Sequence, residues 1–421
     1  MPVVAPVLFL AIFSLLLFLH DLPVGSSNGE APADVLVMHG AFHVRAQTPG
    51  GGDRRAEVLE AAASLGLEFL VLTGDRRELS AQETTSDALV LIPAAELSLE
   101  GGNLLLIGQD AAVAPGRPLG DGTMEVRAGA SAKRLHMAVL ARPMSWHDGW
   151  DQREYSPTLR KHDTVPRAID DVPRLGIEFL VASVEHENEF TSPYLPAAWY
   201  YYLGLLNQSY AVFSLYDRPK DALESWDDLS AGRPWPAPGF CASDAQHQLG
   251  DQALALQTLG TYAHIPADTP PAGRAQAIEK SLRTGWHHCA VDLIATAPDF
   301  DFRILSTDGA RYWPMGDRVR MRDDLKIRVR APGLGDRSIR VSIFRDGQLM
   351  ALRPTRRVDL PVEKSGVYRV EVDVYLENPV LGAAWVPWIY SNPILITESA
   401  IPDTAPGTDP TAPAPPSSDE Q

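Results

Sequence analysis

Short apolar runs alternate with amphipathic segments from residue 34 onward, which is the pattern of an α/β protein. The clearest unit has an apolar run at 35–38, helical spacing of apolar positions across 54–65, and a second apolar run at 67–72. Gly66 ends the predicted helix. This order of strand, helix and strand predicts a parallel sheet or barrel. Further buried strands are predicted at 88–92, 104–107, 137–141, 177–182 and 239–242, and a core helix at 199–206.

The hydrophobic pattern changes after a predicted helix at 275–283. Apolar and polar residues then alternate with a period of two, which predicts strands at 326–329, 339–344 and 367–374. Turn sequences separate these strands. We therefore predict a second domain, a small antiparallel β-sandwich that follows the α/β barrel.

The N-terminal segment predicts export. Residues 3–19 are apolar except for Ser14. This segment is long enough for a signal-peptide core, and its length is marginal for a membrane helix, which spans roughly 20 residues. The small residues at 31–33 fit a cleavage site, and the stretch from Pro23 fits a tether to an uncleaved anchor equally well. We expect an extracytoplasmic protein, whether secreted, periplasmic or membrane-anchored, that contacts a membrane only through this segment if it is uncleaved.

The chain has 421 residues, 45% of them hydrophobic, which is enough for more than one domain. We divide it into a leader or anchor with a linker (1–33), an α/β barrel (34–262), a helical connection (263–295), a β-sandwich (296–398) and a disordered Pro-rich tail (399–421).

The net charge and the cysteine content limit which binding partners and which kinds of site are expected. The formal net charge of −17 argues against a nucleic-acid-binding surface, which needs clustered Lys and Arg, and favours small molecules. Cys241 and Cys289 are too few for a disulfide framework or a Cys-based zinc site. One disulfide and two separate buried thiols both stay open.

Polar residues follow the predicted strands of the barrel, where functional side chains lie in this architecture. They are His43 and Arg45, Thr73 and Asp75, Glu96, Arg142, Glu185 and His186, and Asp244 and His247. Seven acidic or imidazole groups at one barrel mouth would indicate a metal centre.

Several of these positions lie in motifs of a known family. The sequences HGAFHVR at 39–45 and TGD at 73–75 resemble the opening of PHP (polymerase and histidinol phosphatase) domains of the CehA/McbA-like kind. PAAELS at 93–98, ARP at 141–143 and ASDAQH at 242–247 resemble later motifs of that family, and the likeness spans about 34–398. The resemblance implies a distorted (βα) barrel, divalent zinc, manganese or iron ions, and hydrolysis of phosphate esters.

The departures from the family affect its metal ligands. Arg45 and Arg142 stand where the family has ligand histidines, and a guanidinium cannot bind a metal ion. Such arginines would hold an anionic group, phosphate or carboxylate, or would pair with retained acids in a vestigial pocket. The metal ligands that remain available are His43, Asp75, Glu96, Asp244 and His247.

Three hypotheses on function stay open. The first is an exported PHP-like, metallophosphoesterase-like pseudoenzyme, non-catalytic or weakly active, that binds an anionic small molecule at the barrel mouth and needs no cofactor. The second is an active metal-dependent phosphoesterase, a hydrolase of phosphate esters with a reduced metal site. The third is binding of a carbohydrate or an envelope partner through the β-sandwich, based on Trp313, Trp385 and Trp388. No catalytic residue is assigned.

Two further groups of histidines do not support a metal site of their own, and the second, at 287–289, is expected to serve packing. His39 and His43 have the spacing of a helical metal site, but their segment is predicted to be strand and loop. His287, His288 and Cys289 are adjacent on a predicted extended segment, where neighbouring side chains point apart.

Overall fold

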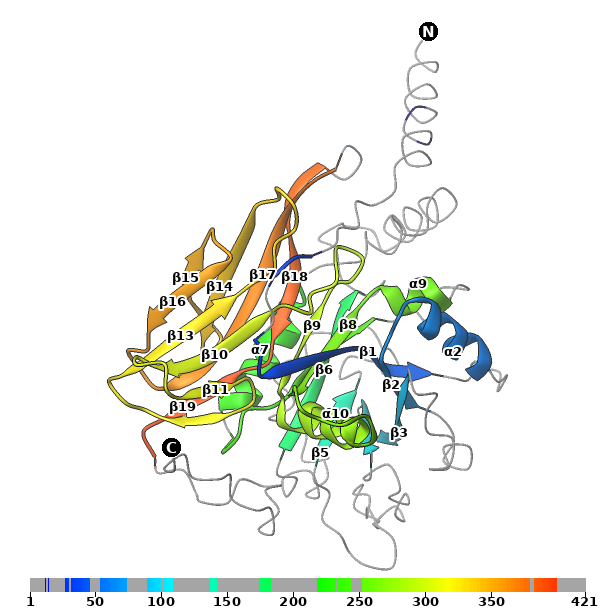
Figure 1. The fold of residues 1–421 in the computed structure, drawn as a ribbon, viewed down its shortest axis with the longest axis horizontal. Helices are drawn as coiled ribbons and strands as arrows, with labels where there is room; N and C mark the ends of the chain where they lie inside the picture. The colour runs from blue at the N-terminus through cyan, green and yellow to red at the C-terminus, as the bar shows by residue number, and fades with distance from the viewer. Residues whose placement is uncertain are drawn as a thin grey trace, which may run out of the picture.

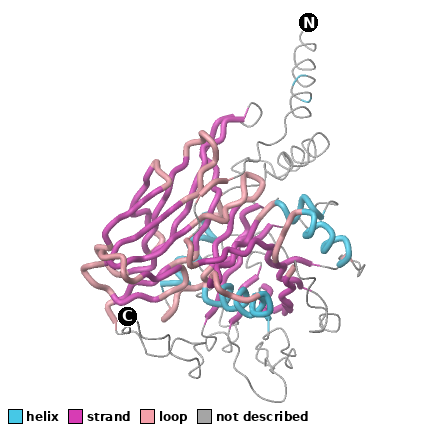
Figure 2. The backbone as a smooth tube through the Cα atoms, in the orientation of Figure 1, coloured by secondary structure: helices cyan, strands magenta, loops and turns pink. Residues whose placement is uncertain are grey.

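The computed structural model describes most of the chain from residue 252 onward and separate segments before it. The described residues are 12, 14, 27–29, 32–45, 54–73, 89–99, 102–108, 137–141, 174–182, 218–231, 233–243, 252–378 and 382–399. They form a mixed α/β structure with many strands and few helices (Figure 2). No described helix is long and apolar enough to cross a membrane.

The part of the fold before residue 291 contains every helix that the structure describes. Its elements are β1 (Val35–Arg45), α2 (Arg55–Ser64), β2 (Phe69–Thr73), β3 (Val90–Leu99), β4 (Gly102–Ile107), β5 (Met137–Ala141), β6 (Arg174–Ala182), α7 (Lys220–Ala231), β7 (Gly239–Ser243), α9 (Gln252–Gln257), β8 (Gly260–Pro266), the 3-10 helix η4 (Pro271–Gly273), α10 (Arg274–Thr284) and β9 (His287–Ala290).

The second part consists of strands. They are β10 (Asp301–Ser306), β11 (Tyr312–Pro314), β12 (Arg318–Arg320), β13 (Leu325–Arg330), β14 (Ile339–Arg345), β15 (Gln348–Arg353), β16 (Arg357–Pro361), β17 (Gly366–Asn378), β18 (Gly382–Ser391) and β19 (Ile394–Thr397). Figure 1 shows them gathered in one half of the molecule, with α2, α9 and α10 in the other.

The N-terminal strands form one curved run in the order β8-β1-β2-β3-β4-β5-β6-β7. The pairs β1–β2, β2–β3, β5–β6 and β6–β7 are parallel, whereas β3–β4, β4–β5 and β1–β8 are antiparallel. In the described residues no hydrogen-bonded ladder leads from β7 back to β1. The mixed α/β class is confirmed, and these strands form an open sheet with no closed barrel in the described part of the chain, in which the antiparallel pairs β3–β4 and β4–β5 interrupt the parallel order of a (βα) barrel.

The same sheet continues into the C-terminal strands. β9 pairs with β8 through Cys289 and Thr261, and with β18 through Cys289 and Tyr390. From β18 the sheet runs on through β17, β19 and β12, while β14 also pairs with β17 and β15 pairs with β14. The connection predicted at 263–295 thus contains α10 and also β9 and most of β8.

A separate antiparallel sheet has the order β11-β10-β13-β16. Its inward side chains, such as Ile304 and Val329, belong to the same buried cluster as Val341 and Val372 of the large sheet. Burial of one such side chain stabilises the fold by about 1.5–3 kcal/mol. This shared core holds the two sheets together, in agreement with the predicted separate antiparallel unit.

Most predicted elements are confirmed where the structure describes them. The strand at 137–141 has the predicted bounds, and α2 and α10 match the predicted helices within about two residues. β1 extends seven residues beyond the predicted 35–38, to Arg45, and β3 extends to Leu99 instead of 92. The helix predicted at 199–206 and the Pro-rich tail lie outside the described residues.

Candidate functional site

His43 lies at the carboxyl end of β1 in an unusual backbone conformation. Its φ of 56° is in the left-handed region, which is rare for a non-glycine residue. The pairing of β1 with β2 shifts by one residue between Ala41 and Val44, so His43 lies in a β-bulge. His43 is 9% exposed, and its ring contacts Phe42 edge-on. Strained backbone of this kind often occurs at functional sites, and the bulge re-aims the side chain.

Arg45 and Thr73 lie directly opposite each other where β1 and β2 end. The hydroxyl of Thr73 donates a hydrogen bond to the carbonyl oxygen of Val44 at 3.0 Å, which holds the two strand ends together. Arg45 is partly exposed at this edge. The structure therefore brings His43 and Arg45 to the sheet edge at which the sequence places a site.

Glu96 lies inside a strand instead of following one. β3 and β4 form an antiparallel hairpin in which Glu96 is opposite Leu105 and Ser98 is opposite Asn103. The backbone of Ala94, two residues before Glu96, pairs with Thr73. β3 therefore continues past the end of β2, and Glu96 lies within this continuation. The prediction that Glu96 follows its strand is wrong, because β3 extends to Leu99.

The remaining predicted site residues lie outside the described part of the chain. They are Asp75, Arg142, Glu185, His186, Asp244 and His247. Among the described residues no three His, Cys, Asp or Glu side chains gather closely enough to hold a metal ion.

The described end of β1 does not fit a PHP-type metal centre of two or three ions. His43 is one potential ligand there, but Arg45 carries a permanent positive charge two residues away and offers only N–H donors. A guanidinium at this point opposes cation binding and favours an anion. No chemical step through a metal ion is derived from these residues.

His39 belongs to a different, partly buried cluster. Its Nε2 lies 2.7 Å from Oδ2 of Asp292, and the hydroxyl of Tyr262 donates to Oδ1 of the same carboxylate at 2.6 Å. The His39 ring stacks on Tyr262 with centroids 4.7 Å apart. Burial of the ring lowers the pKa of His39, but the charge and hydrogen bond of Asp292, with Glu68, outweigh this effect and raise it. The cluster links β1, β8 and the segment after β9.

Three histidines beside this cluster are completely shielded from solvent and are held neutral. Burial lowers the pKa of His264 to about 3 and that of His287 to about 4, and it also lowers the pKa of His288 well below its ordinary value. His287 stacks on Phe240, whereas His288 stacks on Tyr262, so adjacent residues of β9 face opposite sides. These contacts are the packing that the strand pattern predicts.

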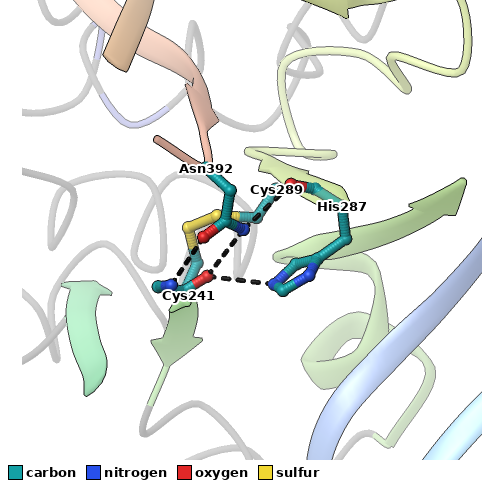
Figure 3. Close-up of a disulfide and its surroundings, with 5 residues drawn as sticks. Cys241, His287, Cys289 and Asn392 are labelled. Atoms are coloured by element: carbon teal, nitrogen blue, oxygen red, sulfur yellow. Dashed lines mark hydrogen bonds between the residues drawn. A yellow bond between two sulfur atoms is a disulfide. The ribbon is translucent and has the colours of Figure 1, made fainter. Parts of the chain in front are cut away.

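Cys241 of β7 and Cys289 of β9 form a disulfide (Figure 3). Beside it, the Asn392 side chain accepts a hydrogen bond from Gly239 N–H at 2.7 Å and donates to the carbonyl oxygens of Gly239 and His287. Gly239 is a close-approach glycine, since a Cβ there would lie 2.3 Å from the Trp226 ring. β7 is therefore held to β9 by side-chain hydrogen bonds and the disulfide, and not by backbone hydrogen bonds between paired strands.

A buried charge network joins α7 to β17. Arg369, 2% exposed, donates two hydrogen bonds to Asp227, at 2.6 and 2.7 Å, and a third to Glu371. Arg218 donates two more to Glu371, at 2.7 and 2.8 Å. Burial opposes ionisation of Glu371, but the guanidinium groups outweigh it and lower the pKa of this carboxyl. Two positive and two negative side chains thus balance at this junction.

The three tryptophans considered for ligand binding have different environments. Trp388 is fully buried and donates its indole N–H to the carbonyl oxygen of Ala295 at 2.7 Å. Trp313 packs against the shared core. Trp385 lies under the Arg340 guanidinium, 4.6 Å from the ring centre. Trp388 is therefore a core residue, and no exposed tryptophan platform forms from these three side chains.

The sequence interpretation left the disulfide open as one of two alternatives, which the structure decides in its favour, and it missed the Asn392 contacts and the Arg369 network. Arg369 and Glu371 alternate with buried valines of β17, a pattern typical of a strand with one solvent face. In the structure α7 covers that charged face. The amphipathic sequence of α7 was the one feature that could have indicated that this helix packs on another element.

Comparison of the chain with protein-family models, with curated proteins and with solved structures finds no match.

Proposed function

We propose that this protein is an extracytoplasmic PHP-like pseudoenzyme that binds an anionic small molecule at the carboxyl ends of its N-terminal strands. In this proposal β1 to β7 are a distorted barrel of the PHP type, opened between β7 and β1, and the C-terminal strands are its β-sandwich. The parallel β1–α2–β2 unit and the stacking of Phe240 of β7 on Phe42 of β1, with centroids 4.2 Å apart, support this arrangement.

The observation that carries the proposal is the pair His43 and Arg45 at the end of β1. The strained, buried His43 keeps the position of a family ligand, while Arg45 replaces the next ligand with a permanent cation. A guanidinium binds phosphate or carboxylate through paired N–H donors, so it can supply the charge that metal ions supply in the family. The expected role is binding without hydrolysis, or with weak hydrolysis.

The disulfide between Cys241 and Cys289 supports the extracytoplasmic location. Disulfides persist in oxidising compartments and are reduced in most cytosols.

An active phosphoesterase is the alternative. His43, Asp75, Glu96, Asp244 and His247 would hold zinc, manganese or iron, and such ions activate a water molecule for attack on phosphorus. It needs Arg45 to turn away from the metal position.

Hydrolysis assays separate the two functions. The full chain, supplied with zinc, manganese or iron, is assayed on p-nitrophenyl phosphate and on its diester, beside His43→Ala and the exposed-surface control Arg353→Ala. We expect no metal-dependent hydrolysis above that of His43→Ala, and weaker binding of phosphate to Arg45→Ala than to Arg353→Ala. Metal-dependent turnover that His43→Ala abolishes and Arg353→Ala retains would contradict the proposal.

A further inference from the structure

One face of the separate sheet carries two rows of charged side chains. Across β10, β13 and β16 the first row is Asp301, Arg330 and Arg357, and the second row is Arg303, Arg328 and Asp359. The residues between them, such as Phe302 and Val329, are buried in the shared core. The charged rows therefore form the outward face, because alternate residues of a strand share a side.

Positive charge exceeds negative charge on this face. Arg303 pairs with Asp301 at 2.7 Å, while Asp359 accepts from both Arg328, at 3.0 Å, and Arg330, at 2.6 Å. Like charges directly opposite each other, as in Arg330 beside Arg357, are unfavourable in a sheet. An anion between them would remove that repulsion.

Arg356, the neighbour of Arg357, adds one more guanidinium group to a cavity that these arginines line. Within the described part of the chain neither forms an ion pair. With Arg303, Arg328 and Arg330 they make five guanidinium groups, against the carboxylates of Asp299, Asp301 and Asp359, so the group carries a net charge of +2. This concentration of positive charge contrasts with the chain's net charge of −17.

These arginines surround a cavity of about 360 Å³. Its far wall is the N-terminal segment: Asn28 exchanges two backbone hydrogen bonds with Gly333, at 2.9 and 2.6 Å, and Gly29 lies against Asp299. Gly333 permits this closeness, since a Cβ there would lie 1.9 Å from Nη1 of Arg356. The volume is within the range of small-molecule sites.

We propose that this cavity binds a phosphate group with two negative charges, held by Arg330, Arg356 and Arg357. Planar guanidinium groups match the geometry of phosphate oxygens and form paired hydrogen bonds with them. The site lies on the separate sheet and is independent of Arg45. The phosphate belongs either to a free compound or to the headgroup of an anionic lipid, since the apolar segment at 3–19 precedes the Asn28 wall.

Calorimetric titration of the full chain, in mild detergent, with inorganic phosphate tests the site. The test variant is Arg356→Ala, Arg357→Ala, whose backbone hydrogen bonds stay available. The matched control is Arg320→Ala, Arg353→Ala, which removes two exposed arginines outside the cavity. All titrations are made in the Arg45→Ala background, which removes the phosphate binding proposed for the strand-end site.

The expected result is saturable phosphate binding in the Arg45→Ala background that weakens at least tenfold when Arg356→Ala, Arg357→Ala is added and stays unchanged when the control pair is added. No saturable binding in this background, or equal binding after either pair is added, would overturn the proposal.

Vesicle flotation identifies the source of the phosphate once binding is established. Greater binding to phosphatidylcholine vesicles that contain phosphatidic acid than to phosphatidylcholine alone, lost in the test variant, supports a lipid headgroup. Equal flotation with both vesicles supports a free phosphate compound at the same site.

Discussion

The side-chain amide of Asn392 pairs with the backbone of Gly239 as a neighbouring strand would, by accepting from its N–H and donating to its carbonyl oxygen. Replacing Asn392 with Ala leaves the Gly239 N–H without this partner, while the Gly239 carbonyl oxygen keeps the His287 ring at 3.1 Å. An unsatisfied buried group costs about 1–3 kcal/mol, so we expect Asn392→Ala to lower the free energy of unfolding by at least about 1 kcal/mol in urea denaturation.

Asn392→Asp is the matched variant. It keeps an acceptor for Gly239 N–H but places a negative charge beside two carbonyl oxygens, so it should be at least as destabilising as Asn392→Ala. Wild-type stability in both variants would show that these contacts contribute little.

The disulfide closes a loop of 48 residues between Cys241 and Cys289. Loop-closure entropy for that length corresponds to about 4 kcal/mol, so Cys241→Ser, Cys289→Ser should lose stability of this order. Thiol titration of the denatured, non-reduced chain should find no free cysteine. Two titratable thiols in protein purified from an oxidising compartment would disprove the bond.

Arg369 is the shared cation of the buried network at the junction of α7 and β17. Removing one partner of a buried ion pair leaves an uncompensated charge and typically costs 3–5 kcal/mol, so we expect a loss of about this size in Arg369→Ala. The exposed Arg353→Ala should change stability by less than about 0.5 kcal/mol. Denaturation followed by the fluorescence of the buried tryptophans measures both, and similar small losses in the two variants would contradict the assigned role.

Acid should destabilise the fold below about pH 6.5, where the buried histidines of the unfolded chain begin to bind protons. The folded-state pKa values of His264, about 3, and His287, about 4, lie below the ordinary value, so their stabilising contribution is complete above pH 6.5 and is lost as the pH falls. Each contributes roughly 1.4 kcal/mol per pH unit within this window.

His39 acts in the opposite direction and in another window. Its raised pKa gives stability that is fully present below pH 6.5 and is lost as the pH rises through the folded-state value. Urea denaturation at pH 7 and pH 5 should show lower stability at pH 5, with a smaller difference in His264→Asn. A pH effect of the same size in His264→Asn as in the wild type would show that the His264 ring is not held neutral.

The sequence correctly predicts an element where its apolar pattern and the residues at its ends indicate the same kind of secondary structure. The strand–helix–strand unit of β1, α2 and β2 and the alternating strand β13 belong to this class. β1 was predicted too short because His43 and Arg45 are polar and look like a loop, whereas a β-bulge carries the strand past them.

Long-range relations could not be predicted from one sequence. The separation of Cys241 and Cys289 depends on how far the sheet curves, and the placement of Arg330 beside Arg357 depends on the register between β13 and β16. The site at the strand ends was predicted in part: the structure places His43 and Arg45 there, while Glu96 lies within β3.

The central claim is that the site at the strand ends binds an anion without a metal ion. The metal content of the purified protein tests this claim most directly. The full chain is expressed with zinc, manganese and iron, purified without chelators, and analysed by elemental mass spectrometry beside Glu96→Ala, Asp244→Ala. We predict equal background metal in both proteins. Near-stoichiometric metal in the wild type that the double variant loses would contradict the account and establish a metal-dependent enzyme site.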